Sequence, residues 1–142
     1  MNNRVQSNKK DFKGQNIFVG IDVHLNQWTV TVLTESGYMK KFSQPSSPKS
    51  LFDHLRRNYP GGTYKAVYES GFCGYSACYA LRELGIDCQI VHAADVPTSQ
   101  KEKVTKSDVV DSEKLARSLR SGDLTKSLIY IPSPDRLDDR SL

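Results

Sequence analysis

At 142 residues, the chain is long enough for one domain with one hydrophobic core but not comfortably for two. A formal net charge of +4 is compatible with a nucleic-acid partner, although the charge alone is more typical of a solvated surface. The three cysteines are an odd number without a CxxC pair, which argues against a disulfide framework and a zinc knuckle. No apolar run approaches the roughly 18 residues of a membrane span, so we expect a cytoplasmic protein with no membrane partner.

The N-terminal part of the chain predicts a polar tail followed by three strands. Residues 1–16 show no apolar periodicity, and we expect them to form a disordered tail. Residues 17–22 are a short apolar run typical of a buried strand, and residues 28–33 alternate β-branched side chains, as a second strand does. A tight turn then allows residues 38–42 to return as a third antiparallel strand.

Helices and strands alternate in the remainder of the chain. Ser47 and Pro48 have the pattern of an N-cap and a first helical residue, and Pro60 ends the helix that they begin. The expected order from there is strand, helix, strand, helix and a short final strand, at residues 63–68, 72–84, 87–91, 108–121 and 128–131.

This order predicts an α/β domain with the RNase H-like (RuvC-like) topology. An antiparallel meander followed by βαβα crossovers gives a mixed five-stranded sheet with helices on both faces. We expect that domain to span residues 17–131. Residues 132–142 resemble the capped start of a connecting helix, which is cut short at the last residue and suggests that more sequence follows.

Four carboxylates stand where this topology would bring them together. Asp22 ends the first strand and Glu69 ends the fourth, and these two strands are expected to be neighbours. Asp108 and Asp111 are spaced i, i+3 at the start of the last predicted helix and would share one helical face.

Such a cluster suits phosphodiester chemistry with divalent metal ions. Two hard cations about 4 Å apart can clamp the attacking and leaving oxygens, and hard cations prefer carboxylate ligands. We therefore expect Asp22, Glu69, Asp108 and Asp111 to be both metal ligands and catalytic residues, with Asp22 bridging the two ions.

Each acid also has a purely structural interpretation. Asp22 could be a strand-end turn residue, Asp108 an N-cap, and Asp111 a residue that favours the helix dipole. Glu69 has no equally simple structural role, because it directly follows an apolar strand. Together, the positions of the four acids favour a site over coincidence.

Other polar and aromatic residues are weaker candidates. Lys103 and Lys106 precede Asp108 and could contact phosphate, and Arg117 is a third nucleic-acid-binding candidate. His24 lies two residues beyond Asp22 and is a minor candidate for a position near the metal ions. Trp28 is expected to pack in the core and not to stack on a base.

The motifs around these acids resemble one family of DNA-recombining enzymes. The segments VGIDVHLNQWTVTVL, YESGFCGYSACYAL and KVTKSDVVDSEKLARSL resemble the three N-terminal blocks of the DEDD-motif insertion-sequence transposases of the IS-one-ten group, which includes Piv/MooV-type recombinases. The closing IYIPSPDRLDDRSL resembles that family's border between the catalytic domain and the connecting helices.

The resemblance covers nearly the whole chain from Ile17 onward. It places the D-E-D-D tetrad on Asp22, Glu69, Asp108 and Asp111. It implies DNA transposition by strand cleavage and exchange, with Mg²⁺ as cofactor and Mn²⁺ as a substitute.

The expected partners also come from the resemblance. They are DNA, an element-encoded guide RNA and, in the full-length protein, further copies of the same chain. The resemblance implies that full-length members of the family add a second domain with a nucleophilic serine, and we expect this 142-residue sequence not to include it.

Three other functions stay open on the sequence alone. One is a stand-alone Holliday-junction nuclease that uses the same carboxylates with water as the nucleophile. Another is a lobe of a sugar-kinase or actin-like ATPase, although the turn after Asp22 has no glycine for phosphate binding. The third is a non-catalytic remnant that only binds nucleic acid.

Overall fold

The computed structural model describes residues 11–70, 74–92, 111–124 and 128–131. Its elements, in chain order, are β1 (Asn16–Val23), β2 (Gln27–Thr34), β3 (Met39–Pro45), α2 (Pro48–Asn58), β4 (Thr63–Glu69), α3 (Ser76–Glu83), β5 (Asp87–Val91) and α5 (Ser112–Ser121).

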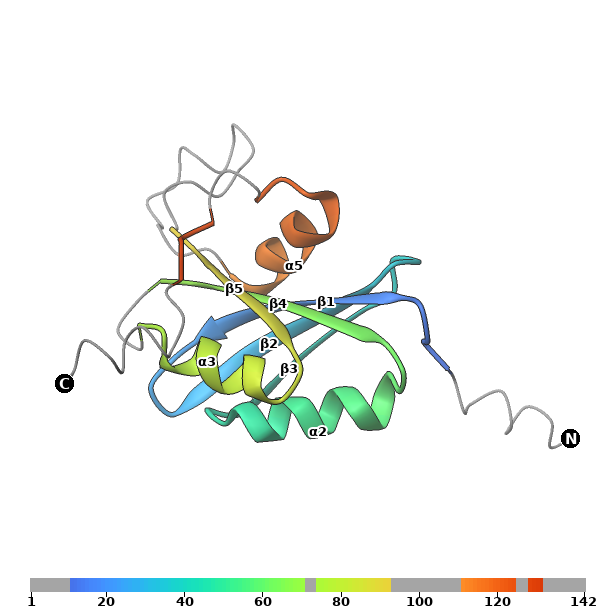
Figure 1. Ribbon diagram of the computed structural model, residues 1–142, viewed down its shortest axis with the longest axis horizontal. Coiled ribbons are helices and arrows are strands. Elements are labelled where there is room, and N and C mark those ends of the chain that lie inside the picture. Colours follow the sequence, from blue (N-terminus) through green and yellow to red (C-terminus); the bar gives the residue numbers. More distant parts are fainter. Residues whose placement is uncertain (1–10, 71–73, 93–110, 125–127, 132–142) are drawn as a thin grey trace, which may run out of the picture.

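The strands form one five-stranded mixed sheet in the order β3-β2-β1-β4-β5. Strands β1, β2 and β3 are antiparallel, whereas β4 and β5 continue parallel to β1. Helices α2 and α3 cover one face of the sheet and α5 covers the other (Figure 1). The α/β class with a mixed sheet and helices on both faces is therefore confirmed, and it is consistent with an RNase H-like fold.

The face under α2 and α3 holds the main hydrophobic core. Alternate residues of β1, namely Ile17, Val19 and Ile21, are fully buried there. Leu51 and Leu55 of α2 pack on them, and burying each such side chain is worth about 1.5–3 kcal/mol. The Ser47 side chain caps α2 by accepting a hydrogen bond from the Ser50 N–H, as the sequence predicts.

The opposite face is built for close contact with α5. A Cβ added to Gly20 of β1 would overlap the carbonyl oxygen of Ser112 and lie 2.6 Å from the Ala116 nitrogen. The helix therefore approaches the sheet closely, and only glycine leaves enough space. The buried hydroxyls of Thr31 and Ser112, 2.8 Å apart, hydrogen-bond across the contact.

Helix α5 runs antiparallel to β1. Its first turn lies over Gly20, and its middle packs on Phe18 through Ala116. Near its last turn, Arg120 donates to the carbonyl oxygen of Glu35, in the turn that follows β2. The N-terminus of α5 consequently lies toward the carboxyl end of β1.

The N-terminal segment differs from the expected polar tail where the structure describes it. The Phe12 ring packs edge-on against Tyr59, with centroids 5.3 Å apart, and the Phe12 N–H donates to the Pro60 carbonyl oxygen at 2.8 Å. A single phenylalanine has no periodicity, so this packing could not be predicted from the sequence. Residues 1–10 lie outside the described part of the chain.

Two element boundaries also need correction. Helix α3 begins at Ser76 and α5 at Ser112, later than the predicted starts at residues 72 and 108. Asp111 caps α5 and has an extended backbone, so the helical i, i+3 relation predicted between Asp108 and Asp111 does not apply.

The expected last strand is reduced to a single antiparallel bridge between Val91 and Leu128. Beside it, the Ile129 N–H donates to the carbonyl oxygen of Ile90 at 2.8 Å. The proposed connecting helix at 132–142 lies outside the described residues. Within the residues that are described, no helix is both long and apolar enough to cross a membrane.

Candidate functional site

Asp22 and Glu69 lie at the carboxyl ends of two adjacent parallel strands. The pairing of β1 with β4 runs in register up to Ile21 and Tyr68, and the two acids are the next residues on each strand. Side chains alternate between the faces of a strand. Gly20 contacts α5 and Val67 packs against Leu115 of α5, so Asp22 and Glu69 belong to the α5 face.

Asp111 comes to the same end of the sheet from α5. Its carboxylate accepts a hydrogen bond from the Lys114 N–H at 2.9 Å and caps the helix. Because the first turn of α5 lies over Gly20, this cap stands near the ends of β1 and β4. Asp111 therefore has the N-cap role that the sequence suggested for Asp108, and its second carboxylate oxygen can still accept.

His24 contacts the carboxylate of Asp22. The distance from its Nε2 to Asp22 Oδ1 is 3.2 Å, with side-chain exposures of 60% for His24 and 24% for Asp22. A hydrogen bond from the His24 N–H to the Gln27 carbonyl oxygen, at 3.1 Å, holds the turn that carries the ring. The sequence made His24 a minor candidate, and the structure makes it the neighbour of the first predicted metal ligand.

The donor set has the chemistry that a hard divalent cation requires. Asp22 and Glu69 supply carboxylate oxygens from two neighbouring strands, and Asp111 supplies a third carboxylate from the helix cap. Even so, among the described residues no three His, Cys, Asp or Glu side chains lie close enough together to hold a metal ion. Asp108, Lys103 and Lys106 are outside the described residues.

Arg117 is on the solvent side of α5. Its guanidinium forms a surface ion pair with Glu113 one turn earlier, at 3.0 Å. Pairs of this kind are exchangeable with water and contribute little to stability. The role of Arg117 in nucleic-acid binding stays a prediction.

The clearly shifted pKa values in the described residues belong to groups between the sheet and α2 or α3. Burial, followed by the charges of Lys40 and Arg57, lowers the pKa of His54. A hydrogen bond between the two thiols lowers the pKa of Cys78, and the same bond with burial raises the pKa of Cys88. None of these shifts points to catalysis at the carboxylates.

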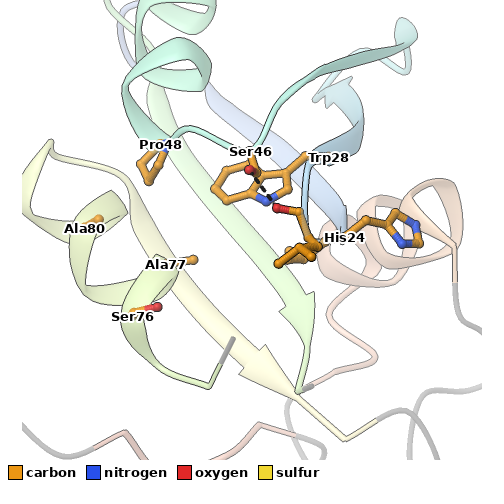
Figure 2. A pocket seen from close by; sticks show the side chains of 9 residues that line it. His24, Trp28, Ser46, Pro48, Ser76, Ala77 and Ala80 are labelled. Atoms are coloured by element: carbon orange, nitrogen blue, oxygen red, sulfur yellow. Dashed lines mark hydrogen bonds between the residues drawn. The ribbon is translucent and has the colours of Figure 1, made fainter. Parts of the chain in front are cut away.

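A cavity of about 470 Å³ opens beside the turn that follows Asp22. Figure 2 shows Ala77 and Ala80 of α3 facing the Trp28 indole across it, with Pro48 at the start of α2. The complete lining is Val23, His24, Leu25, Trp28, Ser46, Pro48, Ser76, Ala77 and Ala80. The sequence did not predict this cavity, because it depends on how α3 lies against the β1–β2 turn; the small residues of α3 are the only local sign.

Two curated proteins are similar to the chain. One is named "Putative transposase y4rJ", from Sinorhizobium fredii (strain NBRC 101917 / NGR234), with 25% identity over 141 residues, covering 89% of this chain and 36% of that protein. The other is the transposase for insertion sequence element IS1533 of Leptospira borgpetersenii, with 26% identity over 108 residues, covering 74% of this chain and 31% of that protein.

The chain therefore spans about a third of the length of these relatives. No family model matches the chain.

Proposed function

We propose that the chain is the metal-binding catalytic domain of a DEDD-type transposase, which acts in DNA transposition by cleaving and exchanging DNA strands. One observation carries the proposal. Asp22 and Glu69 occupy adjacent positions at the ends of parallel strands, on the face where α5 begins. The similarity to two proteins named as transposases supports it.

The residues of the proposed site would have different roles. Asp22, Glu69, Asp108 and Asp111 would hold Mg²⁺ or Mn²⁺ through carboxylate oxygens. When bound, the ions would activate the attacking oxygen and stabilise the leaving oxygen of the phosphodiester. His24 would orient the Asp22 carboxylate through the contact at 3.2 Å.

Three further features rest on the family resemblance. It implies that strand exchange uses a serine of a second domain, that an element-encoded RNA guides the reaction, and that the full-length protein assembles as a homo-oligomer. Lys103, Lys106 and Arg117 would contribute positive charge to phosphate binding.

The first test is Mn²⁺ binding, measured by the loss of the free-ion electron paramagnetic resonance signal. We expect Asp22→Asn and Glu69→Gln each to weaken binding by at least about tenfold, since even residues that only support metal ligands are worth about 10–100-fold. Asp53→Asn is the matched control, because Asp53 is an acid of α2 on the opposite face, paired with Lys49.

Equal Mn²⁺ affinity of the wild type and Asp22→Asn would overturn the proposed site. Metal binding accompanied by cleavage of branched DNA by this chain alone would instead favour the junction-nuclease alternative.

A further inference from the structure

The cavity beside Asp22 is separated from the predicted metal site by a single strand end. Asp22 faces α5, whereas the next residue, Val23, lines the cavity on the face of α2 and α3. Consecutive Cα atoms are about 3.8 Å apart, so one turn borders both places. His24 belongs to both, because it lines the cavity while its ring, which points away from α3 in Figure 2, contacts Asp22.

The lining of the cavity suits an uncharged, flat, largely apolar group. Its nine described residues include no Asp, Glu, Lys or Arg, so a phosphate or another ion would find no partner of opposite charge among them. Trp28, which is 3% exposed and packs in the core as the sequence predicts, forms the floor of the cavity. The Pro48 ring lies at its edge, and Ala77 and Ala80 leave the space opposite open. The volume of about 470 Å³ is within the usual range for small-ligand sites, about 300–1,000 Å³.

An apolar residue projects from the rim of this cavity. Leu25 is 73% exposed at the tip of the β1–β2 turn. The turn is held at two points: the Ser46 hydroxyl donates to the Leu25 carbonyl oxygen at 3.0 Å, and the His24 N–H donates to the Gln27 carbonyl oxygen. Proteins that distort DNA insert such apolar side chains between base steps.

We infer that the cavity binds one unstacked nucleobase of the DNA strand held at the carboxylates, and that Leu25 takes the place of that base in the stack. The inference rests on the proposed function. An extruded base explains the combination of an exposed leucine, a neutral cavity with ring surfaces, and a catalytic carboxylate one residue away. It would also place the neighbouring phosphate at the metal ions that Asp22 and Glu69 would hold under the proposed function.

Trp28 provides a direct readout, because it is the single tryptophan of the chain and lines the cavity. We expect a single-stranded oligonucleotide to quench its fluorescence. An abasic oligonucleotide of the same length carries the same phosphates, and we expect it to bind without quenching. Loss of the base contribution should weaken its binding roughly five- to 150-fold.

Two variants test the cavity and the Leu25 side chain separately. Ala80→Leu adds side-chain atoms at a partly buried position that lines the cavity, and it should abolish quenching while salt-dependent binding persists. Leu25→Ala should reduce the fluorescence rise of 2-aminopurine placed in duplex DNA, which reports unstacking. Tyr38→Ala is the matched control, because Tyr38 is 62% exposed beside the other hairpin turn.

The possible results are distinguishable. Binding of both oligonucleotides with equal affinity and no quenching overturns the base-binding inference and leaves the proposed function standing. Quenching by the abasic strand, or quenching that persists in folded Ala80→Leu, also overturns it. If neither oligonucleotide binds, the inference and the proposal of DNA as substrate fail together.

Discussion

The two faces of the sheet are built from different kinds of residues. Under α2 and α3, large aliphatic and aromatic side chains interlock, and Leu51 and Leu55 are completely buried. Under α5, smaller apolar clusters around Leu115 and Phe18 are combined with the close approach of the helix at Gly20 and with the buried hydroxyl pair of Thr31 and Ser112. The first face supplies most of the apolar burial, whereas the second fixes the position of one helix end relative to two strand ends.

The α2 and α3 face therefore mainly provides stability, whereas the α5 face mainly fixes the position of the site. A large apolar interface tolerates small shifts, because hydrophobic stabilisation is not directional. A helix held against a glycine and a buried hydrogen bond has less freedom, since both depend on direct contact. The acids stand on the face where contact is closest, which suits a site that requires fixed geometry.

The largest effect is expected from Leu55→Ala on the α2 side. Removing a fully buried leucine side chain should cost about 2–5 kcal/mol of unfolding free energy, measured by urea denaturation. Lys49→Ala in the same helix removes only an exposed ion pair with Asp53 and should cost less than about 1 kcal/mol. Similar losses in the two variants would mean that α2 does not pack as described.

Gly20→Ala on the α5 side should cost about 1–3 kcal/mol, because the new methyl group meets the backbone of Ser112 and Ala116. The same substitution should weaken Mn²⁺ binding, since α5 and its Asp111 cap must move away from the strands. Leu55→Ala should leave Mn²⁺ binding nearly unchanged in the folded fraction. The opposite pattern would contradict the division between the two faces.

Asp111→Ala should have a smaller effect on stability, about 0.5–2 kcal/mol, through loss of the N-cap of α5. Asp111→Asn keeps a capping side chain and should recover most of that stability, yet it removes a carboxylate charge. If Asp111 is also a metal ligand, Mn²⁺ affinity will fall in both variants. Recovery of affinity in Asp111→Asn would restrict Asp111 to capping.

The smallest expected effect is the pH dependence due to His54. Its pKa in the folded protein is lowered from the ordinary value of 6.5, by burial first and then by Lys40 and Arg57. The folded state therefore binds fewer protons than the unfolded state, so this contribution to stability is present above pH 6.5 and declines as the pH falls below it. His54→Gln should flatten that part of the stability profile in thermal melts, and an unchanged slope would contradict the assignment.

Much of the fold was predictable because its signals are local. A short apolar run located β1, alternating β-branched residues located β2, and the Ser47–Pro48 pair located the start of α2. The start of α5 was not predictable, because Asp108 and Asp111 are both good capping residues and the choice depends on the contact with Gly20.

The candidate site likewise has features that the sequence predicts and features that depend on tertiary packing. The adjacency and parallel direction of β1 and β4 follow from the topology, so the sequence correctly predicted that Asp22 and Glu69 lie near the ends of neighbouring strands. The contact of His24 with Asp22 depends on the path of one turn. The cavity depends on the separation of α3 from that turn, and no periodic pattern encodes such a distance.

Strand β3 has a consequence for the solubility of the domain. In the described part of the chain it is the outermost strand of the sheet beside β2, and such a strand can pair with another chain and start aggregation. Its exposed lysines, Lys40 and Lys41, make a second copy of the strand repel it, and Pro45 lacks the N–H that an added strand would need. The strand that completes the meander is thus also protected against unwanted growth of the sheet.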